Sequence, residues 1–322
     1  MKQIIWLSGE HPSLPLAELK GASHAENVRI TEVFSRIAVI EGKNAPYVFQ
    51  RMGYARKSSD FIAEGNMDEV IESIKRFELP DGSFAVRAWK YGDFEGNRRD
   101  VERKIGGILA KERKIDLEKP DNILSLYLGE KIFAGMEVKD KRNLSEREPT
   151  KRPFFSPVTL SPKMARALIN LSRAERGKEL LDPFCGTGAV LLEASIIGIK
   201  AIGSDFDERM IKGAEINLKH YGAKAELHVR DISEISSIKV QHIATDPPYG
   251  RSSTTGREAV EKLYKRAFKA MAESMDSGYL AMILPDMRHS SMAEEEGFSL
   301  IEHHEVRVHR SLTRHFCVFR RD

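Results

Sequence analysis

The sequence predicts an α/β fold with a doubly wound parallel sheet, preceded by a smaller α+β region. Three observations support this fold class. Short apolar strands alternate with helical stretches through the second half of the 322-residue chain. A proline-rich segment, Arg147 to Pro162, separates the two halves, and proline neither continues a helix nor donates to a central sheet ladder. Two loop motifs each follow a predicted strand, and alternating β and α units are typical of a parallel sheet with helices on both faces.

The elements of the second half follow from local patterns. Ser161-Pro162 predicts a helix start, because serine caps the amino end of a helix and proline is tolerated in its first turn. Apolar residues at helical spacing continue this helix to Leu171, and a second clear helix runs from Val260 to Met271. Residues 305–320 contain two runs rich in β-branched and aromatic residues and are expected to form a closing hairpin. Strands are predicted at 179–181, 200–203, 225–229, 242–244 and 279–284.

The first half is less regular and is read as an α+β region, divided into two small lobes near residue 60. Apolar and β-branched runs predict its strands, and helical spacing of apolar residues predicts its helices. The strands are expected at 4–7, 28–30, 38–40, 84–89 and 123–128, and the helices at 45–53, 68–77 and 97–111.

Composition excludes several classes of protein. A hydrophobic fraction of 41% allows two packed cores. Residues 1–12 lack the apolar core of a signal peptide and no apolar run is long enough to cross a membrane, so we expect a cytoplasmic protein without membrane contact. Cys185 and Cys317 lie far apart without neighbouring cysteine–histidine pairs, so neither a disulfide framework nor a structural metal is expected. The 51 basic and 48 acidic residues nearly cancel, so a nucleic-acid surface must be local.

The first motif, Asp182-Pro183-Phe184-Cys185-Gly186-Thr187-Gly188, has the composition of a cofactor loop. Gly186 and Gly188 let the backbone approach a ligand closely, because no Cβ intervenes. Dinucleotide sites seat a pyrophosphate at the same kind of turn. Here the glycine spacing is shorter and an acidic residue opens the motif. Asp182 therefore suits the positively charged amino group of S-adenosylmethionine better than a phosphate.

Two further acids follow the next two predicted strands. Asp205 ends the second strand, where a carboxylate can accept hydrogen bonds from ribose hydroxyls. Asp231 follows the third strand and is placed to accept a hydrogen bond from an adenine amino group. Asp207 is expected to cap the following helix, and Cys185 to be a small packed residue. Acids at three successive strand ends, together with the glycines, predict a nucleoside cofactor.

The second motif, Asp246-Pro247-Pro248-Tyr249, predicts the chemical half of the site. An exocyclic base amine is a poor nucleophile, because its lone pair is delocalised into the ring. The Asp246 carboxylate and the Pro247 carbonyl can accept hydrogen bonds from its two N–H groups. The prolines restrict the turn that positions these two acceptors. Tyr249 can stack on the base and hold it in line. Such a base must be unpaired or flipped out, and residues 250–256 are expected to form a loop over it.

In this order, the motifs resemble those of the S-adenosylmethionine-dependent amino-methyltransferases. Residues 155–171 are similar to the segment before the cofactor loop, and His309 to Arg314 is similar to a C-terminal element near the target pocket. In the first half, Phe84 to Arg87, Arg99 to Glu102 and Ile105-Gly106 resemble a THUMP domain. The pairing resembles the archaeal tRNA guanosine-10 N2-methyltransferase family over nearly the whole chain.

The resemblance implies a Rossmann-like methyltransferase domain over residues 151–322 and an RNA-binding region over 1–150, with a ferredoxin-like lobe at about 1–60 and a THUMP domain at about 61–145. It also implies S-adenosylmethionine as cofactor and tRNA as partner, and it leaves open whether a small activator subunit is needed. Further cofactor contacts are expected at Phe155, Thr159, Phe184, Phe206 and Ile232, and Asp246 is expected to contact the cofactor as well as the target amine. RNA contacts are expected at Arg87, Arg98, Arg99, Arg103, Lys104 and Arg314.

The favoured function is methyl transfer to the N2 amine of a guanosine in tRNA, with mono- or dimethylation open. A DNA adenine-N6 or cytosine-N4 methyltransferase would use the same motif, and only the THUMP-like half argues against it. A glutamine methyltransferase usually carries asparagine at the position of Asp246. A non-catalytic RNA-binding or assembly protein on this scaffold is the alternative from another class, and the presence of both intact motifs argues against it.

Overall fold

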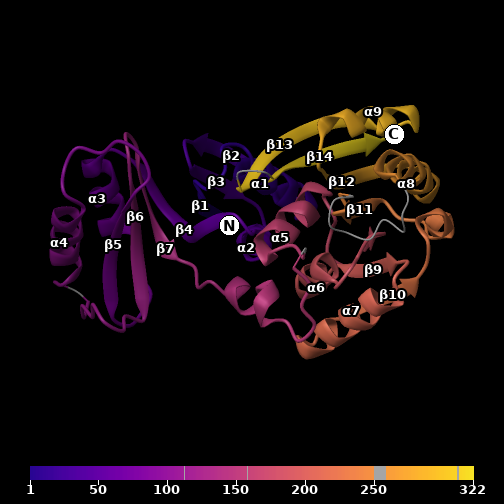
Figure 1. Cartoon of the computed structure of the whole chain (residues 1–322). Coiled ribbons are helices and arrows are strands. Elements are labelled where there is room, and N and C mark those ends of the chain that lie inside the picture. The colour runs from indigo at the N-terminus through magenta and orange to yellow at the C-terminus, as the bar shows by residue number, and fades with distance from the viewer. Residues whose placement is uncertain (112, 158, 250–258, 310–311) are drawn as a thin grey trace. The chain divides into compact units, whose positions relative to one another are not determined.

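The computed structural model describes residues 1–111, 113–157, 159–249, 259–309 and 312–322. The chain divides into two compact units, each built around its own sheet (Figure 1). The first unit comprises Met1–Gly9, Asn27–Phe49 and Ala55–Lys141, and the second comprises Glu10–Glu26, Gln50–Tyr54 and Arg142–Asp322. Two short segments of the first half therefore belong to the second unit. The functional boundaries expected near residues 60 and 150 stay predictions.

The described residues of the first unit form a seven-stranded sheet in the order β2-β3-β1-β4-β7-β6-β5. Only β5 and β6 pair in parallel, and every other neighbouring pair is antiparallel. The strands are β1 (Lys2–Leu7), β2 (Arg29–Phe34), β3 (Ile37–Glu41), β4 (Ala55–Gly65), β5 (Phe84–Lys90), β6 (Asn122–Leu128) and β7 (Ile132–Glu137). Residue 60 lies inside β4, which pairs with β1 and with β7, so the two expected lobes share one continuous sheet.

Two helices of the first unit begin at asparagine caps. The Asn66 side chain accepts from the amides of Asp68 and Glu69 at the start of α3 (Met67–Arg76), and the Asn97 side chain accepts from the Arg99 amide at the start of α4 (Arg98–Leu109). Their apolar stripes pack into one core with β5, β6 and β7. A third helix, α2 (Ala45–Arg51), carries the chain from the first unit into the second.

The second unit contains the predicted α/β fold. Its described strands form a sheet in the order β10-β9-β8-β11-β12-β14-β13, in which β8 to β12 are parallel and β14 runs antiparallel to both of its neighbours. The expected closing hairpin is confirmed and its first strand begins earlier than predicted (Figure 1, yellow). The strands are β8 (Glu179–Asp182), β9 (Lys200–Asp205), β10 (Ala225–Val229), β11 (His242–Thr245), β12 (Gly278–Leu284), β13 (Ser299–His309) and β14 (Leu312–Arg321).

Helices cover both faces of this sheet. Leu168 and Leu192 pack with Ile283 on one face, whereas Phe268 packs with Met282 on the other. The predicted helix starts at Ser161 and Asp207 are confirmed, because each side chain accepts a hydrogen bond from the first turn. The helices are α5 (Pro162–Leu171), α6 (Ala189–Ile196), α7 (Glu208–His220), α8 (Val260–Ser274) and α9 (Ser290–Glu295), with 3₁₀ turns η1 (Leu144–Arg147), η2 (Pro149–Lys151), η3 (Ile232–Ser237) and η4 (Met287–His289).

One helix of the second unit, α1 (Leu14–Ala25), was not predicted from the sequence. Its buried residues include Glu18, Gly21 and Ser23, so the face that packs is not an apolar stripe. A Cβ at Gly21 would lie 2.1 Å from the carbonyl oxygen of Asn170. The helix therefore crosses α5 with backbone nearly touching backbone, a contact that hydrophobic periodicity cannot reveal.

The strand order reverses around β8, which lies between β9 and β11. In open parallel sheets, ligands bind beyond the carboxyl ends of the strands at such a switch point. The two motifs follow β8 and β11, so both reach this crevice. None of the helices in the described ranges has the length and apolar character needed to span a bilayer.

Candidate active site

The cofactor loop makes a tight turn from β8 into α6. The Cys185 amide donates to the Ser204 carbonyl on β9 (3.0 Å), and the Gly188 amide donates back to the Cys185 carbonyl (2.8 Å). Gly186 and Gly188 have φ angles of +50° and +81°, in the left-handed region that favours glycine. A Cβ at Gly188 would also lie 3.1 Å from the Cβ of Ala214, whereas at Gly186 it would meet no heavy atom within 4 Å. Gly186 thus leaves open space beside the loop.

Replacing Gly188 with alanine is expected to lower stability by about 1–2 kcal/mol and to weaken cofactor binding, because a left-handed alanine is strained and crowds α7. Thermal unfolding and calorimetric titration with S-adenosylmethionine would measure both effects. Gly107, in the last turn of α4 with no heavy atom within 4 Å of a built Cβ, is the matched control. Gly107→Ala should stabilise the protein by about 0.5–1 kcal/mol. Equal changes in stability for Gly188→Ala and Gly107→Ala would contradict the inference that the turn at Gly188 requires glycine.

Asp182 ends β8 and is buried, with 2% of its surface exposed. Its Oδ1 accepts hydrogen bonds from the Thr245 hydroxyl (2.7 Å) and the Phe184 amide (3.3 Å). Burial raises the pKa of Asp182 to about 7, against the opposing effect of these hydrogen bonds. A buried acid in this state gains strongly from a cationic ligand, which would favour its ionised form.

Asp205 ends β9 and lies against the cofactor loop. Its Oδ2 accepts from the Gly186 amide (3.0 Å) and its Oδ1 from the Asp207 amide (3.0 Å). Burial raises the pKa of Asp205, and the backbone hydrogen bonds oppose that rise. The carboxylate is therefore held in one orientation by the same turn that carries the glycines.

Asp231 follows β10 and is strongly engaged within the protein. Its Oδ1 accepts from the Ser233 amide (3.0 Å) and from the Arg266 guanidinium (2.6 Å), and Arg266 also reaches Oδ2 at 3.3 Å. The hydrogen bond from Arg266 lowers the pKa of Asp231. Asp231 also caps η3, and the neighbouring Ile232 is 4% exposed within the hydrophobic core. Arg266, on α8, gave no signal in the sequence.

The segment before the loop is tied to it by Asn217 of α7. The Asn217 side chain accepts from the Phe154 amide (2.9 Å) and donates to the Phe154 and Thr187 carbonyls (both 3.0 Å). Thr159 hydrogen-bonds the Thr187 hydroxyl at 2.9 Å. This explains how a segment nearly thirty residues upstream returns to the cofactor loop.

The aromatic residues expected to contact the cofactor differ in exposure. Phe155 and Phe206 are 53% and 49% exposed, so both rings are available to a ligand, whereas Phe184 packs partly against the core. Their place beside the loop is consistent with the cofactor role, which stays a prediction.

Asp246 follows β11 and is enclosed by two partners. The Tyr249 hydroxyl donates to its Oδ1, and the Arg314 guanidinium lies 3.8 Å from its Oδ2. The side chains of Asp246 and Arg314 are only 14% and 11% exposed. Burial raises the pKa of Asp246 to about 6, and the Arg314 charge and the Tyr249 hydrogen bond limit the rise. The enclosed acid is thus kept ionisable near neutral pH.

The two prolines are also positioned by tertiary contacts. The Tyr264 hydroxyl, on α8, donates to the Pro248 carbonyl at 3.3 Å. Within the described ranges, the Pro247 carbonyl accepts no hydrogen bond from the protein. It therefore stays available as an acceptor. Residues 250–256, expected to cover the target base, lie outside the described residues.

A single side chain joins the two motifs. Thr245 is the last residue of β11, immediately before Asp246, and its hydroxyl donates to Asp182 on the neighbouring strand β8. The negative charge of Asp246 adds to the rise in the pKa of Asp182. Sequence reasoning missed Thr245, although its place directly before the motif was visible.

The predicted RNA contacts fall in two places. Arg98, Arg99, Arg103 and Lys104 are exposed on α4 of the first unit, where Arg103 makes a loose pair with Asp100. Arg87 lies on β5 and donates to the Leu117 carbonyl at 2.7 Å. Arg314 instead lies in the second unit beside Asp246. Its role as an RNA contact stays a prediction, and its geometry adds a second role.

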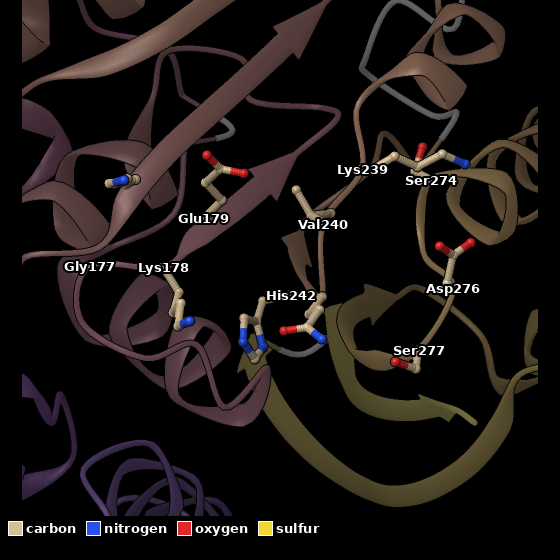
Figure 2. Close-up of a pocket in the computed structure, with 11 residues that line it drawn as sticks. Gly177, Lys178, Glu179, Lys239, Val240, His242, Ser274, Asp276 and Ser277 are labelled. Atoms are coloured by element: carbon tan, nitrogen blue, oxygen red, sulfur yellow. The ribbon is translucent and has the colours of Figure 1, made fainter.

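A cavity of about 450 Å³ opens at the opposite edge of the second sheet. Figure 2 shows the side chains of Lys178, His242 and Asp276 around it, at or near the amino ends of β8, β11 and β12. Ligands of parallel sheets bind at the carboxyl ends of the strands, so this cavity is separate from the site described above.

Comparisons with known proteins agree with this geometry. The family model UPF0020, described as RMKL-like, methyltransferase domain, matches residues 149–315. The chain is 36% identical to the tRNA (guanine(10)-N2)-dimethyltransferase of Methanothermobacter thermautotrophicus over 100% of both chains. It is 35% identical to the protein of that name from Pyrococcus abyssi, over 95% of this chain and 96% of the relative.

Two solved structures share the fold over the full length of this chain. TrmN from Thermus thermophilus aligns with a TM-score of 0.56 and 20% identity, over 100% of both chains. SMU.472, solved in complex with SAH, aligns with a TM-score of 0.54 and 14% identity, over 100% of this chain and 98% of its own. At these identities the likeness supports the fold alone.

Proposed function

The chain belongs to the tRNA (guanine(10)-N2)-dimethyltransferase family, and from this premise we propose that it transfers methyl groups from S-adenosylmethionine to the exocyclic N2 of guanosine 10 in tRNA. Transfer proceeds to the dimethylated product. The hydrogen bond from Thr245 to Asp182 is the observation that carries the proposal, because it joins a cofactor loop to a loop built to accept an amine. In this proposal the two loops together form a single active site of a tRNA methyltransferase.

The residues of the loop fit S-adenosylmethionine. Both hydrogen bonds to Asp182 from the described residues reach Oδ1, which leaves Oδ2 for the ammonium of the methionine part. The Asp205 oxygens each accept one backbone amide and retain a lone pair for a ribose hydroxyl. Asp231 can accept the adenine amino group through Oδ2, since Oδ1 already takes stronger hydrogen bonds. The bound cofactor supplies a methyl group on a sulfonium.

Asp246 and the Pro247 carbonyl act on the target amine. Each accepts one N–H of the guanine N2, which favours a pyramidal nitrogen whose lone pair points at the methyl group. Tyr249 is fixed by its hydrogen bond to Asp246, so its ring can hold the base in line. After the nitrogen has gained the methyl group, it loses its proton to the Asp246 carboxylate that accepts its N–H, and no stronger base is required.

Arg314 is proposed to keep Asp246 ionised. A protonated carboxyl accepts hydrogen bonds poorly, so the rate should fall as the pH drops below about 6, the pKa of Asp246. In Arg314→Gln the opposing positive charge is lost, and the acidic limb of the pH–rate profile should move up by roughly one unit or more. Single-turnover rates between pH 5.5 and pH 9 would measure the shift.

Arg320→Gln, on the same strand but 53% exposed, serves as the control and should leave the profile unchanged. A uniform loss of rate at every pH in Arg314→Gln would instead indicate a purely structural or RNA-binding role for the arginine.

The first unit is proposed to bind the tRNA through a ferredoxin-like lobe and a THUMP domain, at the boundaries expected from the sequence. The exposed arginines of α4 support backbone contact. Arg99→Glu with Arg103→Glu should raise KM for tRNA with little change in kcat, and should lower the salt slope of tRNA binding by about two. Lys75→Glu, on α3, is the control; an unchanged slope in the double variant would exclude α4 from the interface.

The direct test of function is transfer of labelled methyl from S-adenosylmethionine to unmodified tRNA, followed by nucleoside analysis. N2-methylguanosine should appear first and N2,N2-dimethylguanosine later, and a transcript with adenosine at position 10 should accept no label. Label in DNA adenine or cytosine would reject the tRNA substrate while keeping the reaction class. Transfer that requires added cell extract would identify a need for an activator subunit.

A further inference from the structure

A cluster of metal-ligating side chains lies on the closing hairpin of the second unit. His303 and Glu305 are two residues apart on β13, and Glu305 lies directly opposite His315 on β14. Alternate residues of one strand and the residue facing them share one face of the sheet. Their ligand atoms all lie within 4.8 Å of one another, and His303 Nε2 is 2.9 Å from His315 Nδ1. We refer to these three residues as the hairpin cluster.

The hairpin cluster is arranged differently from its neighbours on the other face of β13. There, His304 Nδ1 lies 2.8 Å from the Ser13 hydroxyl, and Glu302 pairs with Arg173 at 3.1 Å, so both side chains serve packing between elements. In the hairpin cluster, the two imidazoles stack at an interplanar angle of 25°, and their facing nitrogens lie within hydrogen-bond distance. Glu305 forms no ion pair with any described residue. Its carboxylate therefore remains free to act as a ligand.

The distances fit a small transition-metal ion. Zn²⁺ binds imidazole nitrogen and carboxylate oxygen at about 2.0–2.2 Å, so tetrahedral ligand atoms lie roughly 3.3–3.5 Å apart. The imidazole nitrogens need to separate by about half an ångström, and the carboxylate needs a rotamer change. Imidazole ligands favour Zn²⁺ over Mg²⁺ or Ca²⁺. The sequence-based expectation of no structural metal rested on the two cysteines, and the hairpin cluster contains no cysteine.

We propose that His303, Glu305 and His315 bind one Zn²⁺ ion, with water in the fourth position. The ion would link β13 to β14 on the side of the sheet opposite Arg314, because neighbouring residues of a strand point to opposite faces. Arg314 is next to His315 and lies beside Asp246. Metal binding would therefore stabilise the strand that delivers Arg314 to the active site. The proposal does not depend on the identity of the methyl acceptor.

The test uses the full-length chain without an affinity tag, freed of metal by a chelator. Titration with Co²⁺ should give the visible absorption of a four-coordinate site at one equivalent, and Zn²⁺ should displace it. His303→Ala and His315→Ala should each weaken binding at least about tenfold. His220→Ala, on the exposed face of α7, should bind as the parent protein does.

Glu305→Gln provides a second variant at an exposed position, in case a histidine variant fails to fold, and it should also weaken binding. The proposal is overturned if no Co²⁺ spectrum appears at one equivalent. It is equally overturned if the affinity for Zn²⁺ is the same in the parent protein and in folded hairpin-cluster variants.

Discussion

Asp246→Ala is expected to reduce kcat for methyl transfer to tRNA by about 10²–10³-fold, the effect of removing one preorganised electrostatic group from an active site. The reason is geometric. Asp246 is the only charged acceptor that the second motif offers to the amine among the described residues, and Tyr249 and Arg314 already hold it in place. Single-turnover assays with saturating tRNA would measure the loss.

Binding must be measured with the same Asp246 variant. Because Asp246 is proposed to act on one amine of the target base and not on the tRNA backbone, the affinity for tRNA should change by less than about threefold, below about 0.7 kcal/mol. Asp276→Ala, at the amino end of the sheet, is the control for a lost aspartate far from the chemistry. Full activity in Asp246→Ala would remove the residue from the mechanism. Inactivity with equally lost tRNA binding would assign it to RNA recognition.

Glu193→Ala is expected to destabilise the second unit by about 3–5 kcal/mol, because it leaves two buried arginines without their anionic partner. Glu193 lies on α6 with no exposed surface and accepts from Arg147 at 2.7 Å and 3.0 Å and from Arg166 at 2.5 Å. Burial alone would raise the pKa of Glu193, but the Arg166 and Arg147 charges outweigh it and hold that pKa below its ordinary value.

The thermal midpoint of the second unit should fall by roughly 6–20 °C in Glu193→Ala. A carboxyl with a lowered pKa stabilises the fold above its unfolded value of about 4.3, and this contribution is lost as the pH falls further. The parent protein should therefore lose stability below about pH 4 more steeply than the variant.

Glu208→Ala removes a solvent-exposed pair with Lys212 and should change stability by at most about 0.5 kcal/mol. Similar midpoints for the Glu193 and Glu208 variants would show that the buried network contributes little to stability.

The parallel strands of the second unit, and the edge of the sheet at which both motifs lie, could be predicted from the sequence for local reasons. Three of the parallel strands, β8, β11 and β12, are short apolar runs followed within two residues by a proline, as in the Asp-Pro pairs at 182 and 246. Since parallel strands end at one edge, residues at successive strand ends must share a crevice. The caps at Ser161 and Asp207 were likewise encoded within four residues.

What the sequence could not supply are contacts between residues far apart along the chain. Arg314 was expected to bind RNA, and only the pairing of β14 with β12 brings it to Asp246, 68 positions earlier. The ion pair of Arg266 with Asp231 and the hydrogen bond of Asn217 with Phe154 likewise join residues far apart along the chain. Helix α1 was missed because it buries Glu18, which accepts from the Gly53 and Tyr54 amides and from Asn170.

By itself, the sequence determined the α/β class, the two motifs and the chemistry that those motifs can support, because these depend on residues that are close along the chain. Only the tertiary structure showed which side chains contact the acids of those motifs. Thr245, which precedes Asp246, donates a hydrogen bond to Asp182, and Arg314 lies beside Asp246. It also assembled the hairpin cluster from two strands. Long-range pairing brings such groups together, and no local pattern records it.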